Sequence, residues 1–184
     1  MSEYQGTFKR YEKKYLVTQQ QYNALAKAFA ARMVPDRFAE STISNIYYDT
    51  PDFRLIRRSL DRPAYKEKLR LRTYRTPGAD TEAFVEIKKK YDHIVYKRRV
   101  AMTYSEAQAY LNGGAAPEQS QISREIDWFL HFYKGIQPAM CICYDRLALF
   151  DKYQPELRVT FDSGIRWRMD DLDLSSGSAG EQLL

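Results

Sequence analysis

Positive side chains recur at every second position between residues 64 and 99, and this alternation constrains the fold more than any other feature. Side chains two residues apart share one face of a β-strand. The alternating residues are Lys66, Lys68, Arg70 and Arg72 in AYKEKLRLRTY, Glu86, Lys88 and Lys90 in AFVEIKKKYD, and Lys97 and Arg99 in IVYKRRV. Most residues between them are apolar or aromatic. The segment therefore predicts three successive strands, each with one cationic face, and a polyanion held between them would balance the charge.

The composition fits a single folded domain. The chain has 184 residues, 44% of them hydrophobic and 14% aromatic, and a formal net charge of +5. Cys141 and Cys143 are adjacent same-face positions of a predicted strand, so we expect reduced, buried thiols and no disulfide. The sequence contains neither an apolar leader nor an apolar run of membrane-spanning length. These features predict a soluble, cytoplasmic protein.

Hydrophobic periodicity and turn residues divide the chain into short elements. Thr18 and Gln21 form a capping box, which predicts a helix to about Met33 that is ended by Pro35. Further helices are expected after the DTPDF stretch, from Thr103 or Ser105 to Asn112, and over residues 121–134. The remaining strands are expected at 7–17, 43–48, 140–150, 156–162 and 165–169. We therefore expect one domain over residues 1–169. Residues 170–184 are expected to form a loop or a flexible tail.

The order of these elements predicts an α+β fold with an antiparallel sheet, because most connections are short. The helices need an apolar surface, whereas the cationic strand faces need water or counter-charge. A sheet curled into a barrel, with helices outside and a cationic bore, meets both needs. Like charges that face inward repel one another. The carboxylates of Glu12, Glu86 and Asp162, together with a bound multivalent anion, would relieve that repulsion.

Several motifs resemble those of a known family. They are EKKYLV, KLRLRTY, FVEIKKKYDHIVYKRRV, CYDRLALF and LRVTFDSGIRWR. In order and spacing they resemble the vacuolar transporter chaperone (VTC) domain, over residues 8–169. That domain is a polyphosphate polymerase of the triphosphate tunnel metalloenzyme, or CYTH-like, superfamily. The superfamily's first strand carries E-x-E-x-K, where this chain has Arg10, Glu12 and Lys14. The resemblance implies an antiparallel β-barrel, the triphosphate tunnel, with helices packed outside.

The resemblance also assigns roles to individual residues. It implies catalytic, phosphate-binding positions at Lys14, Arg70, Arg72, Lys88, Lys97 and Arg146. Alternation adds a second tier of phosphate-binding residues, Lys68, Arg99 and Arg158. Glu12 and Glu86 are the same-face acids available for Mn²⁺ or Mg²⁺, and a structural ion pair is the alternative for each. The implied reaction transfers the γ-phosphoryl group of ATP to a growing polyphosphate chain.

A last strand with an E-x-K-type acid closes the tunnel in this family, and this chain stops at Leu184, just where we expect that strand to begin. An incomplete barrel leaves open edges, which invite pairing with a second copy of the chain. A non-catalytic polyphosphate-binding or sensor module and a tripolyphosphatase are the alternative functions. Nucleic-acid binding is less favoured, because the cations follow strict strand register and do not mix with aromatic residues on one face. A solvated sheet face is the structural alternative.

Overall fold

The computed structural model describes residues 7–9, 12–92 and 94–183. Its strands are β1 (Thr7–Lys9), β2 (Met33–Asp49), β3 (Tyr65–Tyr74), β4 (Glu82–Tyr91), β5 (Ile94–Thr103), β6 (Gln137–Asp151), β7 (Arg158–Arg168) and β8 (Glu181–Gln182). Its helices are α1 (Gln19–Phe29), α2 (Arg54–Leu60), α3 (Tyr104–Leu111) and α4 (Gln121–Phe132), with a short 3₁₀ turn, η1 (Leu174–Ser176). In this part of the chain no helix has the length and apolar character needed to cross a membrane.

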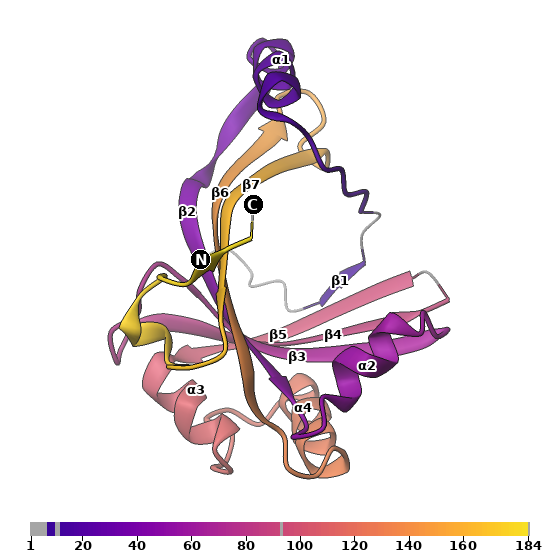
Figure 1. Cartoon of the computed structure of the whole chain (residues 1–184), viewed down its shortest axis with the longest axis vertical. Coiled ribbons are helices and arrows are strands. Elements are labelled where there is room, and N and C mark those ends of the chain that lie inside the picture. Colours follow the sequence, from indigo (N-terminus) through magenta and orange to yellow (C-terminus); the bar gives the residue numbers. More distant parts are fainter. Residues whose placement is uncertain (1–6, 10–11, 93, 184) are drawn as a thin grey trace.

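The strands form one antiparallel sheet in the order β1-β5-β4-β3-β2-β6-β7-β8. The sheet bends strongly, so that β3, β4 and β5 make one wall and the long strands β2, β6 and β7 make another (Figure 1). β1 and β8 lie at the two edges, and within the described residues they do not pair with each other. The fold is therefore α+β with an antiparallel barrel that is not closed, as the sequence predicted.

The hydrophobic core lies on the convex side of the sheet. Leu69 and Leu71 of β3, with Val85 and Ile87 of β4, are at most 1% exposed and project to this side. Helices α2, α3 and α4 cover it (Figure 1), and Phe129 of α4 is fully buried there. Burial of one such side chain stabilises the fold by about 1.5–3 kcal/mol. The apolar residues at alternate positions of the strands thus pack against the outer helices. The cationic residues between them point to the opposite, concave side of the sheet.

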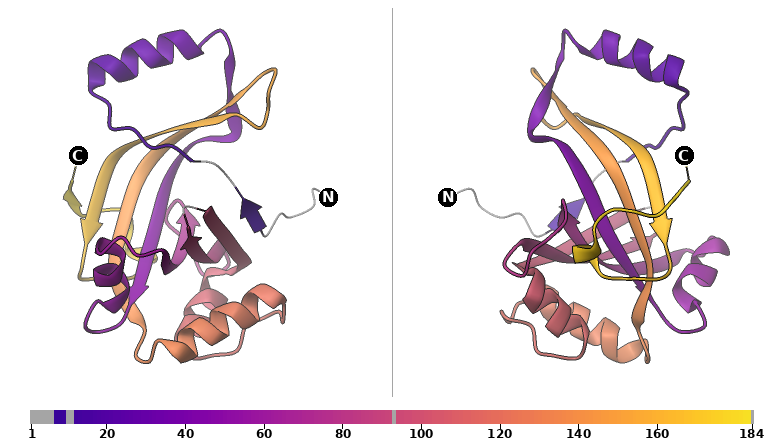
Figure 2. Two further views of the ribbon diagram at one scale, coloured as in Figure 1. Left: turned by 90° about the vertical axis from the view of Figure 1, so that its right-hand side faces the viewer. Right: turned by 60° about the vertical axis from the view of Figure 1, so that its left-hand side comes forward.

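Helix α1 lies apart from the others, at the far end of β2, β6 and β7 (Figure 2). The hydroxyl of Thr18 accepts a hydrogen bond from the backbone N–H of Gln21, and the Gln21 side chain accepts one from the N–H of Thr18. This is the predicted capping box. The rings of Tyr22 and Phe29 pack on Phe161 of β7, at centroid distances of 4.9 and 6.3 Å. The predicted start of α3 is confirmed as well, because Thr103 caps it in the same way.

Several element boundaries differ from the sequence prediction, and β2 begins at Met33 rather than at the predicted Ile43. Residues 12–18 are not part of a strand, and Leu16 among them is 82% exposed. Helix α1 ends at Phe29, and Pro35 lies within β2 opposite Leu149. A proline is tolerated there because β3 pairs with β2 only from Ile43 onward, which leaves one edge of β2 open at Pro35.

The two strands expected after residue 156 are one continuous strand, β7. Gly164 lies between the two predicted segments and has a positive φ of 55°. This backbone conformation costs glycine little, so β7 can bend at Gly164 without ending. A glycine between two strand-like segments is therefore compatible both with a turn and with one bent strand.

The segment after β7 has little regular structure but is held firmly. Leu174 is fully buried in the core. The carboxylate of Asp173 accepts a hydrogen bond from the hydroxyl of Tyr104 at 2.8 Å, which ties the segment to α3. The guanidinium of Arg168 donates to the main-chain oxygens of Asp171, Asp173, Gly177 and Ala179. Residues 170–183 thus form an anchored loop, which ends in the pairing of β8 with β7.

Candidate functional site

The side of β3, β4 and β5 opposite the core is the cationic face. It carries Lys68, Arg70, Arg72, Glu86, Lys88, Lys97 and Arg99. Strand register places Lys68, Lys88 and Lys97 directly opposite one another across the three strands. Neighbouring strands are about 4.8 Å apart, and like charges directly opposite each other destabilise a sheet. This lysine row is therefore a position at which the fold favours a bound anion.

Glu86 is the buried counter-charge of the cationic face. One of its carboxylate oxygens lies 2.5 Å from Nε of Arg70 and 3.8 Å from Nε of Arg72, and the other lies 2.6 Å from Nζ of Lys97. Burial acts to raise the pKa of Glu86, but Arg70, Arg72 and Lys97 together lower it to about 2. The carboxylate is therefore ionised at neutral pH and fixes three cations around itself.

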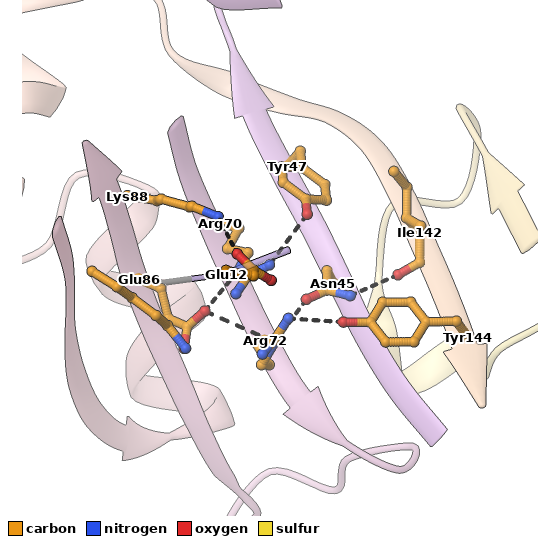
Figure 3. Close-up of polar contacts among 10 residues, drawn as sticks. Glu12, Asn45, Tyr47, Arg70, Arg72, Glu86, Lys88, Ile142 and Tyr144 are labelled. Atoms are coloured by element: carbon orange, nitrogen blue, oxygen red, sulfur yellow. Dashed lines mark hydrogen bonds and ion pairs between the residues drawn. The ribbon is translucent and has the colours of Figure 1, made fainter. Parts of the chain in front are cut away.

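Side chains from the second wall also hold the two arginines (Figure 3). Nε of Arg72 donates to Oδ1 of Asn45 at 2.9 Å, and a terminal nitrogen of Arg72 donates to the hydroxyl of Tyr144 at 3.0 Å. Arg70 donates to the hydroxyl of Tyr47 at 3.2 Å. Asn45, Tyr47 and Tyr144 were not among the predicted site residues. Their role depends on β2 lying between β3 and β6, and the sequence offers no local signal of that order.

Glu12 and Lys14 reach the lysine row from the segment that precedes α1. A carboxylate oxygen of Glu12 lies 3.6 Å from Nζ of Lys88, and the other lies 3.8 Å from Nζ of Lys14. The side chains of Glu12 and Lys14 are 51% and 79% exposed, so these ion pairs contribute little to stability. Both groups are accessible to a ligand at this end of the face. Arg10, the remaining residue of the first-strand pattern, lies outside the described residues.

The structure separates the two arginines predicted on the later strands. Arg146 of β6 makes two parallel hydrogen bonds to the carboxylate of Asp162, at 2.6 and 2.8 Å. Its guanidinium lies 5.1 Å from the ring centroid of Tyr144, which joins it to the cationic face. Arg158 instead lies at the far end of β7, is 53% exposed and pairs with Asp36 at 3.2 Å. Arg146 therefore belongs with the candidate site, whereas Arg158 lies away from it.

A register shift turns the last arginines of β7 to the convex side. The pairing of β6 with β7 shifts between Cys143 and Asp145. Arg166 consequently lies opposite Cys143 and binds the carboxylate of Asp145 at 2.7 Å. Cys141 and Cys143 lie on this same side, buried and without a disulfide, as predicted.

Burial and neighbouring positive charge shift the pKa values of several groups on the cationic face. Burial is the main cause that lowers the pKa of Lys97 to about 8, and Arg72 and Arg70 add to this effect while Glu86 opposes it. Burial likewise lowers the pKa of Lys88, with Glu12 opposing. The pKa of the Tyr47 hydroxyl falls below its ordinary value although burial acts to raise it, because Arg70 stabilises the phenolate. Burial and neighbouring positive charge thus both favour the neutral form of the two lysines, whereas Arg70 favours the phenolate of Tyr47.

Glu12 and Glu86 differ in how well they fit a divalent metal ion. Within the described residues, no three His, Cys, Asp or Glu side chains converge on a position that could hold a metal. Both oxygens of Glu86 are engaged by cations, which would repel a metal ion. Glu12 is half exposed and fits a metal whose other ligands are phosphate oxygens and water, the usual arrangement for Mg²⁺.

The fold is of the CYTH-like, triphosphate tunnel class: an antiparallel sheet curls into a barrel, here not closed, with helices outside and cations on its inner side. Among solved structures, a candidate adenylate cyclase from Bacillus halodurans is similar, with a TM-score of 0.55 and 14% sequence identity. The match covers 86% of this chain and 82% of that chain, and it shows a common fold. No curated protein matches the chain in sequence. The family model of the VTC domain matches residues 9–183, and the chain therefore belongs to the VTC domain family.

Proposed function

We propose that the cationic face binds the phosphate groups of ATP, tripolyphosphate or polyphosphate. The lysine row is the observation that carries this proposal, because it sets Lys68, Lys88 and Lys97 side by side. Arg70 and Arg72 add planar guanidinium groups, each able to bind two phosphate oxygens, while the lysines act as point charges. Among the described residues of this face, cations outnumber carboxylates. A multivalent anion supplies the missing negative charge.

The proposed reaction moves the γ-phosphoryl group of ATP to the end of a polyphosphate chain. The bond from the γ-phosphorus to the bridging oxygen of ADP breaks, a bond to a terminal oxygen of the acceptor phosphate forms, and ADP leaves. No protein nucleophile is required, because phosphoryl transfer depends mainly on positioning and charge neutralisation. Arg70 and Arg72 are held in place by Glu86 and Asn45 before substrate binds, so little reorganisation accompanies the reaction.

A divalent metal ion, Mn²⁺ or Mg²⁺, is part of the proposal and would supply additional neutralisation of phosphate charge. Glu12 would hold it on the protein side, since that carboxylate is accessible. Glu86 acts as the counter-ion that orients Arg70, Arg72 and Lys97.

Location and assembly complete the proposal. Two free cysteines fit a cytoplasmic location, where thiols remain reduced. The edges of the sheet at β1 and β8 are the surfaces through which a homodimer would form. Size measurements on the purified protein, with and without tripolyphosphate, test the assembly directly.

Calorimetric titration with tripolyphosphate tests the binding step. The double variant Arg70→Ala, Arg72→Ala should lose at least tenfold in affinity, because each charge-assisted hydrogen bond contributes about 1.5–3 kcal/mol. A matched control is Lys89→Ala, Arg98→Ala, which removes the same charge from the convex side, where both residues pair with Glu125. Unchanged binding in the first pair, or an equal loss in both, would contradict the proposed site.

Incubation with ATP and Mn²⁺, followed by sizing of the phosphate products, tests the reaction. A polymerase makes chains that lengthen with time and releases ADP. Release of inorganic phosphate from tripolyphosphate indicates a tripolyphosphatase, and tight binding without turnover indicates a sensor module. Preference for an oligonucleotide over tripolyphosphate at matched salt would indicate a nucleic-acid-binding protein instead.

A further inference from the structure

Aromatic side chains lie on the same side of the sheet as the cationic face, at and beyond Arg72, so the expectation that cations and aromatic residues do not mix on one face is wrong. Phe84 is directly opposite Arg72, and Tyr74 follows Arg72 by two residues on β3. The row of Arg72 continues across the second wall through Asn45, Ile142 and Trp167. Tyr144 follows Ile142 by two residues on β6. Because directly opposed residues share a face, these four side chains form one aromatic belt, composed of Tyr74, Phe84, Tyr144 and Trp167.

The aromatic belt combines ring surfaces with guanidinium groups. The rings of Tyr74 and Phe84 meet edge to face, with centroids 5.8 Å apart. The guanidinium of Arg99 lies 4.5 Å over the ring of Phe84, and that of Arg146 lies 5.1 Å over the ring of Tyr144. Tyr74 is 36% exposed and is therefore open to a ligand, whereas Phe84 is buried at 4% exposure and supports the ring of Tyr74. Tyrosine rings and stacked arginines are the surfaces on which proteins stack nucleobases.

We propose that the aromatic belt binds the base of a nucleoside triphosphate whose terminal phosphate lies at the lysine row. This inference rests on the proposed function and specifies the substrate class and its direction in the site. Lys68 and Tyr74 lie on the same strand, about 20 Å apart at ~3.3 Å per residue. Arg70 and Arg72 lie between them. The order ring, arginine, lysine along β3 matches the order base, inner phosphates, terminal phosphate in an extended nucleotide.

The direction has a consequence for the acceptor. With the base at the aromatic belt, the γ-phosphate faces Lys88 and the neighbouring carboxylate of Glu12. The acceptor chain then approaches from the lysine end of the face, in line with the bond to be broken. Purine nucleotides should bind more tightly than pyrimidine nucleotides, because the larger ring system covers more of Tyr74.

Binding measurements with ATP, ADP, CTP and tripolyphosphate at one salt concentration test this inference. We expect Tyr74→Ala to lower ATP affinity about tenfold and to leave tripolyphosphate affinity within about twofold. Lys68→Ala should instead reduce the ratio of ATP affinity to ADP affinity. Tyr74→Ala should leave that ratio unchanged. Tyr96→Ala is the matched control, because Tyr96 is 37% exposed on the convex side of β5 and should change none of these affinities.

A spectroscopic readout avoids dependence on one substitution. In a Trp128→Phe background, ATP should change the fluorescence of Trp167 and tripolyphosphate should not. Equal affinity of the unmodified protein for ATP and tripolyphosphate, or an equal loss for both ligands in Tyr74→Ala, overturns the inference while leaving phosphate binding intact. Failure to bind tripolyphosphate at all overturns the proposed function itself, so the two failures are distinguishable.

Discussion

Replacing Glu86 by glutamine should destabilise the free protein by about 3 kcal/mol. Removal of one partner from a buried ion pair costs about 3–5 kcal/mol, and the Glu86 carboxylate is only 1% exposed between Arg70 and Lys97. The pKa of Glu86 gives the same magnitude. It lies at about 2 in the fold against an ordinary value of 4.5, and one pKa unit corresponds to about 1.4 kcal/mol.

The pH dependence follows from the direction of that shift. Since the pKa of Glu86 is lower in the folded state, its stabilisation is fully present above pH 4.5 and is lost as the pH falls toward 2. The difference in unfolding free energy between the native protein and Glu86→Gln should therefore be largest at neutral pH and vanish near pH 2. Urea unfolding monitored by tryptophan fluorescence at a series of pH values measures it.

A control and a ligand experiment make this prediction specific. Glu125→Gln removes a carboxylate that pairs with Arg98 and Lys89 on the convex side and is 25% exposed, so its loss should be at most about 1 kcal/mol. Tripolyphosphate should stabilise Glu86→Gln more than the native protein, because the ligand restores negative charge among the cations. A loss below about 1 kcal/mol at pH 7, or one that does not change with pH, refutes the counter-ion role of Glu86.

Further predictions concern the cations, the metal and a helix start. The tripolyphosphate affinity of the native protein should fall about tenfold more between pH 7 and pH 9 than the affinity of Lys97→Arg. The reason is that the ammonium of Lys97, with a pKa of about 8, loses its proton in this range. Titration calorimetry in matched buffers measures both affinities. Arg146→Ala should weaken tripolyphosphate binding several-fold, whereas Arg158→Ala should change it by less than about twofold, and a competition assay ranks the two. Removal of divalent metal with EDTA should leave tripolyphosphate binding largely intact and abolish ATP turnover, and full turnover in EDTA would exclude the metal. Thr103→Ala should destabilise the protein to urea by about 1 kcal/mol through loss of the α3 cap, with unchanged tripolyphosphate affinity.

Local sequence rules predicted those parts of the fold that depend on neighbours along the chain. The capping residues Thr18 and Thr103 begin helices where expected. The alternation of Lys68, Arg70 and Arg72 does produce one cationic and one core-facing side of β3. In each case the signal lies within a few residues, and tertiary packing agrees with it.

The parts that the sequence could not predict depend on distant pairings. Pro35 suggests a helix end, but it lies in β2 because one edge of that strand is open at this point. Asn45 and Tyr47 join the candidate site because β2 lies beside β3. Arg166 follows the same alternation as Arg158 in sequence, yet the shift between Cys143 and Asp145 places it on the convex side. Strand order and register set these outcomes, and neither is visible in single-sequence periodicity.

The placement of the N-terminal elements has a consequence for folding during synthesis. β1 pairs with β5, and α1 packs on Phe161 of β7, so both elements precede their partners by a large part of the chain. Synthesis proceeds from the N-terminus, and contacts distant in sequence form slowly. Helix α1 can form locally but is positioned only after β7 has been made. Glu12 lies between β1 and α1, so both of its flanking elements are in place only after β7 has been made. Until then, a growing chain would expose the lysine row to any polyanion in its surroundings.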